Sequence, residues 1–507
     1  MTDLSSDAPM HGHVPPPGVG AWPPPPEARI VNRRATVTWP LGQARQCIGA
    51  AAVVGIAADQ AVATDPIGLA GSVAALAAIV ALTTVTRLRG AARMWAALGL
   101  AVTPWLSVRA SPWLVIPDIV AIGALLALSA APGGLPQTFF RSLANVAGIV
   151  RASLGVPKEL PGLLRAGRRS GVSDNRVGSR WGFALAIPLV TVVVALLASA
   201  DAVFRSLFNG LHLSTSLRHG VVIGFGALAW FALVIRTRRA APERVAGRLL
   251  IGEREAGVII AALSAVLGLY VASTVAAAAA GQAYVERRSG LTYAQYARSG
   301  FFQLIAVVLI VVAVLVTLRP VIDLAVHRRT TFGLSLVMAA LTMAVVAVSI
   351  ARLQTYRSVY GLTMLRLSTT VFAGWLGLVL IMVAVTMVRN SWRPALVSAV
   401  IVSSIMALVG MNWVNPEAMV ARENLERLNV VNDVGDLASW RAAFDDVYVS
   451  ELLGDDAVPA IVSRLGLLPE VQRATVVNVL CRRGQANHGW SWNFSRWKAK
   501  DRLKSLC

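Results

Sequence analysis

The sequence predicts an all-α protein, in which a polytopic bundle of about eleven transmembrane helices is followed by a small soluble helical domain. Of its 507 residues, 56% are hydrophobic and only 14% are charged, whereas soluble domains carry about 25% charged residues. The apolar residues gather in runs of about 20, the length that a helix needs to cross a bilayer. Because lipid cannot satisfy backbone polar groups, these runs are expected to be helices.

The basic residues between the apolar runs predict the orientation of the chain. Lys and Arg concentrate in the N-terminal arm and in every second gap after it, and segments rich in these residues remain in the cytoplasm. The N-terminus is therefore predicted inside, and an odd number of crossings places the C-terminus outside. The net charge of +21 is mainly this topology signal, with contact to anionic membrane lipids as a second interpretation, and no nucleic-acid partner is expected. The predicted spans are residues 47–63, 67–86, 94–108, 112–131, 182–200, 219–236, 256–280, 300–320, 331–350, 369–388 and 394–412.

This pattern divides the chain into five segments. Residues 1–40 form a disordered, Pro-rich cytoplasmic arm without the apolar core of a signal peptide, and the arm either docks on a protein partner or is an inert tail. Residues 41–131 hold the first block of about four spans, and the basic loop 132–181 contains an amphipathic pattern suited to the inner leaflet. A second block of about seven spans covers 182–412, and residues 413–507 form an extracytoplasmic helical domain.

Local signals predict four or five short helices in the C-terminal domain. Asn415 is expected to cap a helix that has Pro416 at its first position. The run "WSWNFSRWKAK" begins the last helix and contains Trp490, Trp492 and Trp497. These tryptophans either pack into the core of the domain, which we favour because tryptophan buries a large area, or lie at the outer membrane interface.

A short Gly-Leu-Thr motif occurs twice in the second block of predicted spans. "RSGLTYAQYARSGFF" and "RSVYGLTMLRLSTTVFAGW" each place Gly-Leu-Thr after an arginine and before a long apolar run. Glycine permits a left-handed turn and threonine is a good N-cap, so Gly290-Leu291-Thr292 and Gly361-Leu362-Thr363 are predicted to start helices above the membrane.

The same outer regions hold the arginines that we expect to form an interaction surface. Their predicted partners are a carboxylate, a lipid phosphate or the C-terminal domain, and the alternative is simple anchoring at the interface. The candidate residues are Arg287, Arg288, Arg298, Arg352, Arg357 and Arg366.

Several of these motifs, in this order, resemble a known family. They are "SADAVF", "YAQYARSGFFQL", "RSVYGLTMLRL", "NPEAMVARENLER", "DDAVPAIVSRL" and "WSWNFSRWKA". Together they are similar to the bacterial membrane family called domain of unknown function 4173, with the related class 4153, over residues 182–500 or so. The resemblance implies a multi-pass membrane protein with no assigned activity.

No metal or catalytic signature accompanies these features. The six His residues and three Cys residues lack metal-binding spacing, and the nucleophile-elbow, Walker and dinucleotide-binding patterns are absent, so no cofactor is expected. If the chain is an enzyme, the candidate acids are Asp59, Asp65, Asp118 and Asp201, for which the sequence offers no facing basic partner.

These observations favour a non-enzymatic sensor, scaffold or assembly factor of the bacterial cell envelope. The protein would lie in the plasma membrane with several passes and bind a protein partner through the C-terminal domain or the Pro-rich arm. The first alternative is a polyprenyl-linked glycosyltransferase, which shares this topology by analogy only, and the second is a transporter.

Two cysteines fall in the predicted outer domain. Cys481 and Cys507 end successive predicted helices, so antiparallel packing would separate them, whereas a bent final helix would bring them together. A bridge requires Cα atoms within about 7 Å and would close a loop worth on the order of 3 kcal/mol. The alternative, two unpaired thiols, is the one that we favour from sequence.

Overall fold

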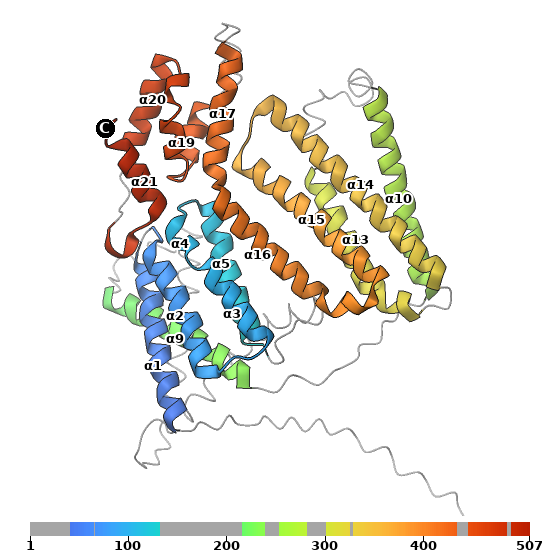
Figure 1. Cartoon of the computed structure of the whole chain (residues 1–507), viewed down its shortest axis with the longest axis horizontal. Helices are drawn as coiled ribbons and strands as arrows, with labels where there is room; N and C mark the ends of the chain where they lie inside the picture. Colours follow the sequence, from blue (N-terminus) through green and yellow to red (C-terminus); the bar gives the residue numbers. More distant parts are fainter. Residues whose placement is uncertain are drawn as a thin grey trace, which may run out of the picture. The chain divides into compact units, whose positions relative to one another are not determined.

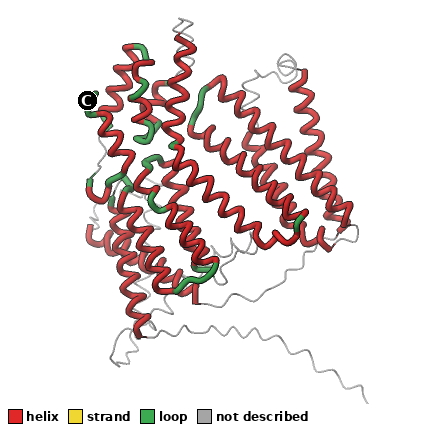
Figure 2. Tube along the Cα trace, viewed as in Figure 1, coloured by secondary structure: helices red, strands yellow, loops and turns green. Residues whose placement is uncertain are grey.

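The computed structural model describes part of the chain, and all regular structure in that part is helical (Figure 2). The Pro-rich arm, the basic loop 132–181 and the predicted span 182–200 lie outside the described residues. The described residues are 41–64, 66–131, 215–238, 253–280, 301–324, 328–432, 445–483 and 488–507.

Seven helices in these ranges are long and apolar enough to cross a membrane. They are α1 (Leu41–Ala63), α2 (Leu69–Thr86), α5 (Pro112–Ser129), α10 (Glu253–Ala280), α14 (Arg328–Tyr360), α15 (Met364–Val388) and α16 (Leu396–Val414). The predicted spans at 219–236 and 300–320 fall on α9 (Thr215–Arg238) and α13 (Phe301–Leu324), whose apolar stretches are shorter. The described helices therefore have the composition of a membrane protein.

The predicted span at 94–108 is not a single helix. It divides into α3 (Ala91–Val102) and the single turn α4 (Trp105–Val108), and Pro104 stands at the break. Proline lacks the amide hydrogen that a continuing helix needs, and its ring clashes with the preceding turn. With 12 residues, α3 is about 18 Å long, too short to cross a hydrocarbon core of about 30 Å.

One group of helices contains α1, α2 and α9, with α1 in contact with both of the others (Figure 1). Gly55 of α1 lies so close to α9 that a side chain there would clash with the carbonyl oxygen of Ile223. Small residues permit such close helix packing in membranes. The indole of Trp230 in α9 donates a hydrogen bond to the Ala78 carbonyl of α2 at 3.1 Å. Thus α9, which belongs to the predicted second block, packs against helices of the first block.

A second group contains α10, α13, α14 and α15 (Figure 1). Its apolar core includes Leu315, Met338 and Leu380. Arg319 of α13 is buried and donates a hydrogen bond to the Thr386 carbonyl at 2.7 Å, near the end of α15. A helix C-terminus has unpaired carbonyl groups and a partial negative charge, so this arginine stabilises the end of α15.

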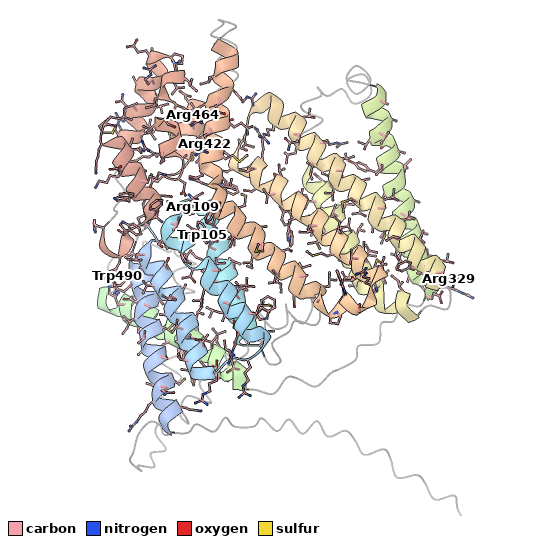
Figure 3. All side chains as sticks on the ribbon, in the orientation of Figure 1. Trp105, Arg109, Arg329, Arg422, Arg464 and Trp490 are labelled. Carbon is pink, nitrogen blue, oxygen red and sulfur yellow. A yellow bond between two sulfur atoms is a disulfide. The ribbon has the colours of Figure 1, made fainter. Side chains whose placement is uncertain are left out.

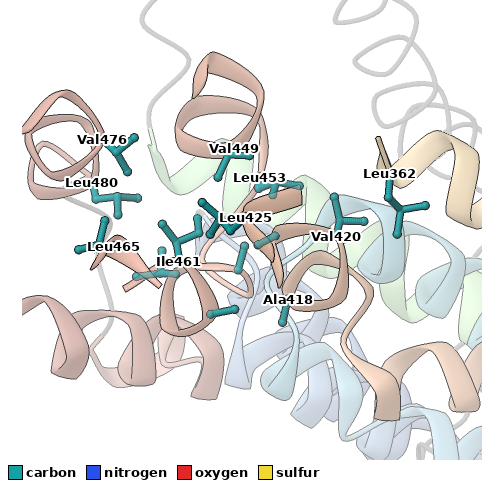
Figure 4. Close-up of a cluster of buried hydrophobic side chains, with 14 of the residues drawn as sticks. Leu362, Ala418, Val420, Leu425, Val449, Leu453, Ile461, Leu465, Val476 and Leu480 are labelled. Atoms are coloured by element: carbon teal, nitrogen blue, oxygen red, sulfur yellow. The ribbon is translucent and has the colours of Figure 1, made fainter. Parts of the chain in front are cut away.

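The C-terminal domain follows α16 after one residue, Asn415. Its elements pack around one apolar core, to which Leu362 from the turn between α14 and α15 also contributes (Figure 4). The elements are α17 (Pro416–Asn432), η2 (Tyr448–Leu452), α19 (Val458–Val462), η3 (Leu465–Leu467), α20 (Glu470–Cys481), η4 (Gly489–Ser491) and α21 (Phe494–Leu503).

Two local predictions for this domain have different outcomes. Asn415 caps α17 as predicted, because its side-chain oxygen accepts the Ala418 amide at 3.2 Å and Pro416 is the first helical residue. The prediction that the tryptophans form the core is wrong for Trp490 and Trp497, which are 48% and 50% exposed. The core is aliphatic instead, and it includes Leu425 and Ile461.

Candidate functional site

The turn before α15 forms the helix start that its sequence predicts. Gly361 has a φ of 74°, a left-handed conformation in which glycine carries no steric cost. The Thr363 hydroxyl accepts the Arg366 amide at 3.3 Å and so caps α15 at Met364. The other copy of the motif, Gly290-Leu291-Thr292, lies outside the described residues.

This turn is bound by α17, and we call the set of contacts the first docking contact. The Asn424 side chain accepts the Leu362 amide at 2.9 Å and donates to the Leu362 carbonyl at 2.7 Å. The Tyr448 hydroxyl accepts the Met364 amide at 2.7 Å. Backbone groups that are buried need such partners, so α17 and η2 replace the water that the turn would otherwise bind.

Charged side chains extend the first docking contact. Arg357, near the end of α14, forms a two-pronged ion pair with Glu423 of α17, and this pair raises the pKa of the Arg357 guanidinium. Arg427 donates to the Arg357 carbonyl at 3.0 Å. One of the predicted arginines therefore pairs with a carboxylate of the C-terminal domain.

The other predicted arginines have different surroundings. Arg366 donates to the Gly361 carbonyl within its own turn. Arg352 lies over the ring of Tyr270 in α10, 5.9 Å from the centroid, a distance at which a cation and an aromatic face attract. Arg287, Arg288 and Arg298 lie outside the described residues.

A second docking contact joins the domain to the segment between α4 and α5. Asp456 is 2% exposed, and its carboxylate accepts the amides of Ala110 at 2.8 Å and Ser111 at 2.7 Å. It also accepts the Ser495 hydroxyl and lies 3.5 Å from the Arg109 guanidinium. This carboxylate is therefore surrounded by donors from both sides of the contact.

Further polar bonds widen the second docking contact towards the start of α2. Asn493 donates to the Arg109 carbonyl at 2.9 Å, and Arg496 donates to the Ile67 carbonyl at 2.7 Å. The Leu69 amide donates to the Trp492 carbonyl at 2.8 Å. A side chain at Gly68 would approach the same Trp492 oxygen to 2.5 Å, so the close contact requires glycine at this position.

A further buried carboxyl group of the domain is that of Glu417, at the start of α17. It accepts the Gly454 amide at 2.9 Å and is 1% exposed. Burial raises its pKa to about 7, and the negative charge of Asp456 acts in the same direction. Burial also raises the pKa of Asp455, which lies 3.9 Å from Arg483.

Two of the candidate catalytic acids, Asp59 and Asp118, are among the described residues, and each has its partner on a neighbouring helix. The expectation that they lack a basic partner is wrong for Asp59, because His219 of α9 lies 2.8 Å from its carboxylate. Asp118 of α5 is fully buried and accepts the side-chain amide of Asn412 in α16 at 2.9 Å. Asp65 and Asp201 lie outside the described residues. Within the described ranges, no group of three or more His, Cys, Asp and Glu is arranged to hold a metal ion.

Cys481 and Cys507 form a disulfide, with their Cα atoms 5.8 Å apart. Two unpaired thiols, the alternative that the sequence favoured, are therefore not the arrangement in the structure. Cys481 is the last residue of α20, and the chain after α21 turns back towards it. Turn residues that follow α21, rather than a bend within the final helix, precede Cys507.

The residues that sequence reasoning missed are the ones that hold the domain in place. Glu417, Asn424, Asp456 and Asn493 lie within the motifs that carry the family resemblance, but no catalytic or metal-binding pattern singles them out. The partners that join them to the docking contacts or to Gly454 are 37 or more positions away along the chain. Only the pairing of backbone segments in three dimensions identifies them.

Comparison with known proteins identifies a family for this chain. The family described as "Domain of unknown function (DUF4153)" matches residues 49–463, a segment that includes both docking turns, Glu417 and Asp456. No curated protein and no solved structure matches the chain. The matched class is the one named above as related to class 4173, and the narrower resemblance to class 4173 stays a prediction.

Proposed function

We propose, for a chain that belongs to the family described as "Domain of unknown function (DUF4153)", a non-enzymatic role as an envelope scaffold or sensor. In this role the membrane helices hold the C-terminal domain at the membrane surface, where the domain presents a binding face to a partner. The domain would not be a tethered module, because it is fixed to the ends of several helices.

The observation that supports this proposal best is the double attachment of the domain. The first docking contact binds it to the turn between α14 and α15, and the second binds it to the segment between α4 and α5. These segments belong to different parts of the helix arrangement, so the domain connects them. Surfaces that are fixed in this way lose little conformational entropy when a partner binds.

The buried carboxylates are occupied by partners within the protein, which also favours this role over catalysis. Asp456 accepts two backbone amides and a hydroxyl, which leaves it little capacity to act as a base or nucleophile. Asp59 and Asp118 are each paired across a helix contact. Carboxylates that are held in this way have little freedom to act on a substrate.

We place the protein in the bacterial plasma membrane, with several passes, the N-terminus inside and the C-terminal domain outside. The supporting observations are the alternation of basic residues and the disulfide, which is typical of oxidising compartments. Alkaline phosphatase fused after Cys507 should be active outside the cell, and the same enzyme inserted in the loop 132–181 should be inactive. The opposite pair of results would contradict this topology.

The role itself is tested by removing the first of the two docking contacts. The double variant Glu423→Arg/Asn424→Ala removes the ion pair and both Leu362 hydrogen bonds, whereas Glu470→Arg changes an exposed residue at the start of α20. Proteins that co-purify from native membranes with the wild type and with Glu470→Arg should be lost with the double variant, at equal protein levels.

Two results would contradict the scaffold role. One is recovery of the same partners after the first docking contact has been removed. The other is co-purification of a polyprenyl lipid together with loss of function in Asp59→Asn at normal protein levels, which would favour the glycosyltransferase.

A further inference from the structure

A polar pocket of about 430 Å³ lies where the C-terminal domain meets the ends of α4 and α16. Residues of α17, α19 and α21 line it, together with Arg109 and Asn415. Figure 3 labels three of its arginines, Arg109, Arg422 and Arg464. Its charged lining consists of Arg109, Arg422, Arg464, Lys498, Arg502, Asp455 and Asp456.

The two acids of the pocket do not neutralise its outer part. Asp455 and Asp456 are both buried, and Asp456 is occupied by the amides of the second docking contact. Arg109 donates to the Asn412 carbonyl at 2.7 Å and lies close to Asp456, and Arg464 pairs with Glu426. These four side chains belong to the framework of the pocket.

Three cations remain at the mouth of the pocket. Arg422, Lys498 and Arg502 are exposed, and none of them has a carboxylate partner among the described residues. Lys498 and Arg502 are four positions apart on α21 and so share one face, and Arg422 approaches from α17. Like charges that converge on one cavity repel each other unless an anion lies between them.

The pocket also adjoins the end of a candidate membrane span. Asn415 in its wall directly follows Val414, the last residue of the candidate span α16. Trp413 beside it is 77% exposed. Phe494 in the lining packs against Trp497 with 5.8 Å between the ring centres, and both rings are exposed. Exposed aromatic rings next to basic residues are typical of the interface between lipid tails and water.

We infer that this pocket binds the phosphate group of an anionic membrane lipid. Arginine and lysine donate strong, charge-assisted hydrogen bonds to phosphate oxygens. The aromatic side chains beside the pocket and its position at the end of α16 favour a lipid headgroup over a soluble phosphate. The inference goes beyond the scaffold role and does not depend on which side of the membrane the domain occupies.

The test uses the full-length protein in a zwitterionic detergent and three probes: dioctanoyl phosphatidylglycerol, dioctanoyl phosphatidylcholine and inorganic phosphate. Binding is measured by native mass spectrometry and by the change in melting temperature. The pocket variant is Lys498→Gln/Arg502→Gln. Its matched control, Lys500→Gln/Lys504→Gln, removes the same charge from other positions of the α21 segment.

Wild type and control should bind phosphatidylglycerol, and the pocket variant should bind it about 30-fold more weakly, since each basic residue near an anionic headgroup contributes about a fivefold change. Arg422→Gln, on the other side of the pocket, should weaken binding about fivefold by itself. Phosphatidylcholine should bind all variants weakly and equally.

Two outcomes would overturn the inference. Equal weakening in the pocket variant and the control would show that any basic residue of the domain suffices and that no site exists. Binding of inorganic phosphate in the pocket without binding of phosphatidylglycerol would assign the site to a soluble anion.

Discussion

Replacing Glu417 by glutamine should change how stability depends on pH. Glu417 is 1% exposed, and its carboxyl group accepts the Gly454 amide. Its pKa is raised from an ordinary 4.5 to about 7, mainly by burial. Glutamine has nearly the same shape and keeps an oxygen that accepts the Gly454 amide, but it is neutral at every pH.

The sign of the effect follows from the two states of the chain. In the unfolded chain Glu417 loses its proton near pH 4.5, whereas in the folded protein it keeps the proton up to about pH 7. Between these values the unfolded state binds fewer protons, so the wild type loses stability as pH rises. Above pH 7 the wild type has lost all of the stability that the protonated Glu417 allows. A pKa difference between 4.5 and about 7 corresponds to a loss on the order of 3 kcal/mol.

The assay is thermal unfolding of wild type and Glu417→Gln in the same detergent from pH 4.5 to 8.5. The two melting temperatures should be close at the acidic end, and the variant should become progressively more stable as pH rises, with the full difference reached above pH 7. Glu470→Gln, an exposed carboxyl at the start of α20, is the control and should follow the wild type. Parallel curves for wild type and Glu417→Gln would refute the reasoning, because Glu417 would then titrate alike in both states.

Three other changes test the domain attachment. Gly361→Ala should destabilise the protein by roughly 1–3 kcal/mol, because φ is 74° and the new Cβ would lie 2.6 Å from Asn424 Oδ1, as measured by thermal unfolding. A double-mutant cycle of Arg357→Ala and Glu423→Ala should give a coupling of roughly 1 kcal/mol, since both side chains are partly exposed. Mass spectrometry of unreduced protein should find Cys481 joined to Cys507, and reduction should lower the stability of the domain by about 3 kcal/mol.

For each of these three predictions, one result would contradict it. Gly374→Ala, in α15, has open space around its position and should not destabilise, so equal effects at Gly361 and Gly374 would mean that the turn is not specifically bound. A coupling near zero would remove the ion pair from the docking contact. Free, alkylatable thiols in protein from intact cells would exclude the disulfide.

Short-range features of the fold were predictable because their causes lie within a few residues. The cap at Asn415 and the helix start at Gly361-Leu362-Thr363 depend on local backbone conformation and on one side chain. Long apolar runs also identify helices that can cross a membrane. The break at Pro104 was hidden in such a run, because average hydropathy responds weakly to one proline.

Contacts between distant segments were not predictable in the same way. His219 and Asp59 are 160 positions apart, and only the close packing of α1 and α9 brings them together. Asn424 meets Leu362 because of the path that the chain takes through α15 and α16. The disulfide depended on a turn after α21, which helix propensity does not specify.

The single residue between α16 and α17 has a mechanical consequence. Asn415 adopts a φ of 56°, caps α17 and donates to the Asp456 carbonyl at 3.0 Å. These contacts hold the junction between α16 and α17 in one conformation. With 17 residues, α17 acts as a lever about 25 Å long, and tilting α16 by about 10° would swing its far end by about 4 Å. The first docking contact transfers that swing to the turn before α15. A change in bilayer thickness that altered the tilt of α16 would therefore strain the α14–α15 hairpin as well.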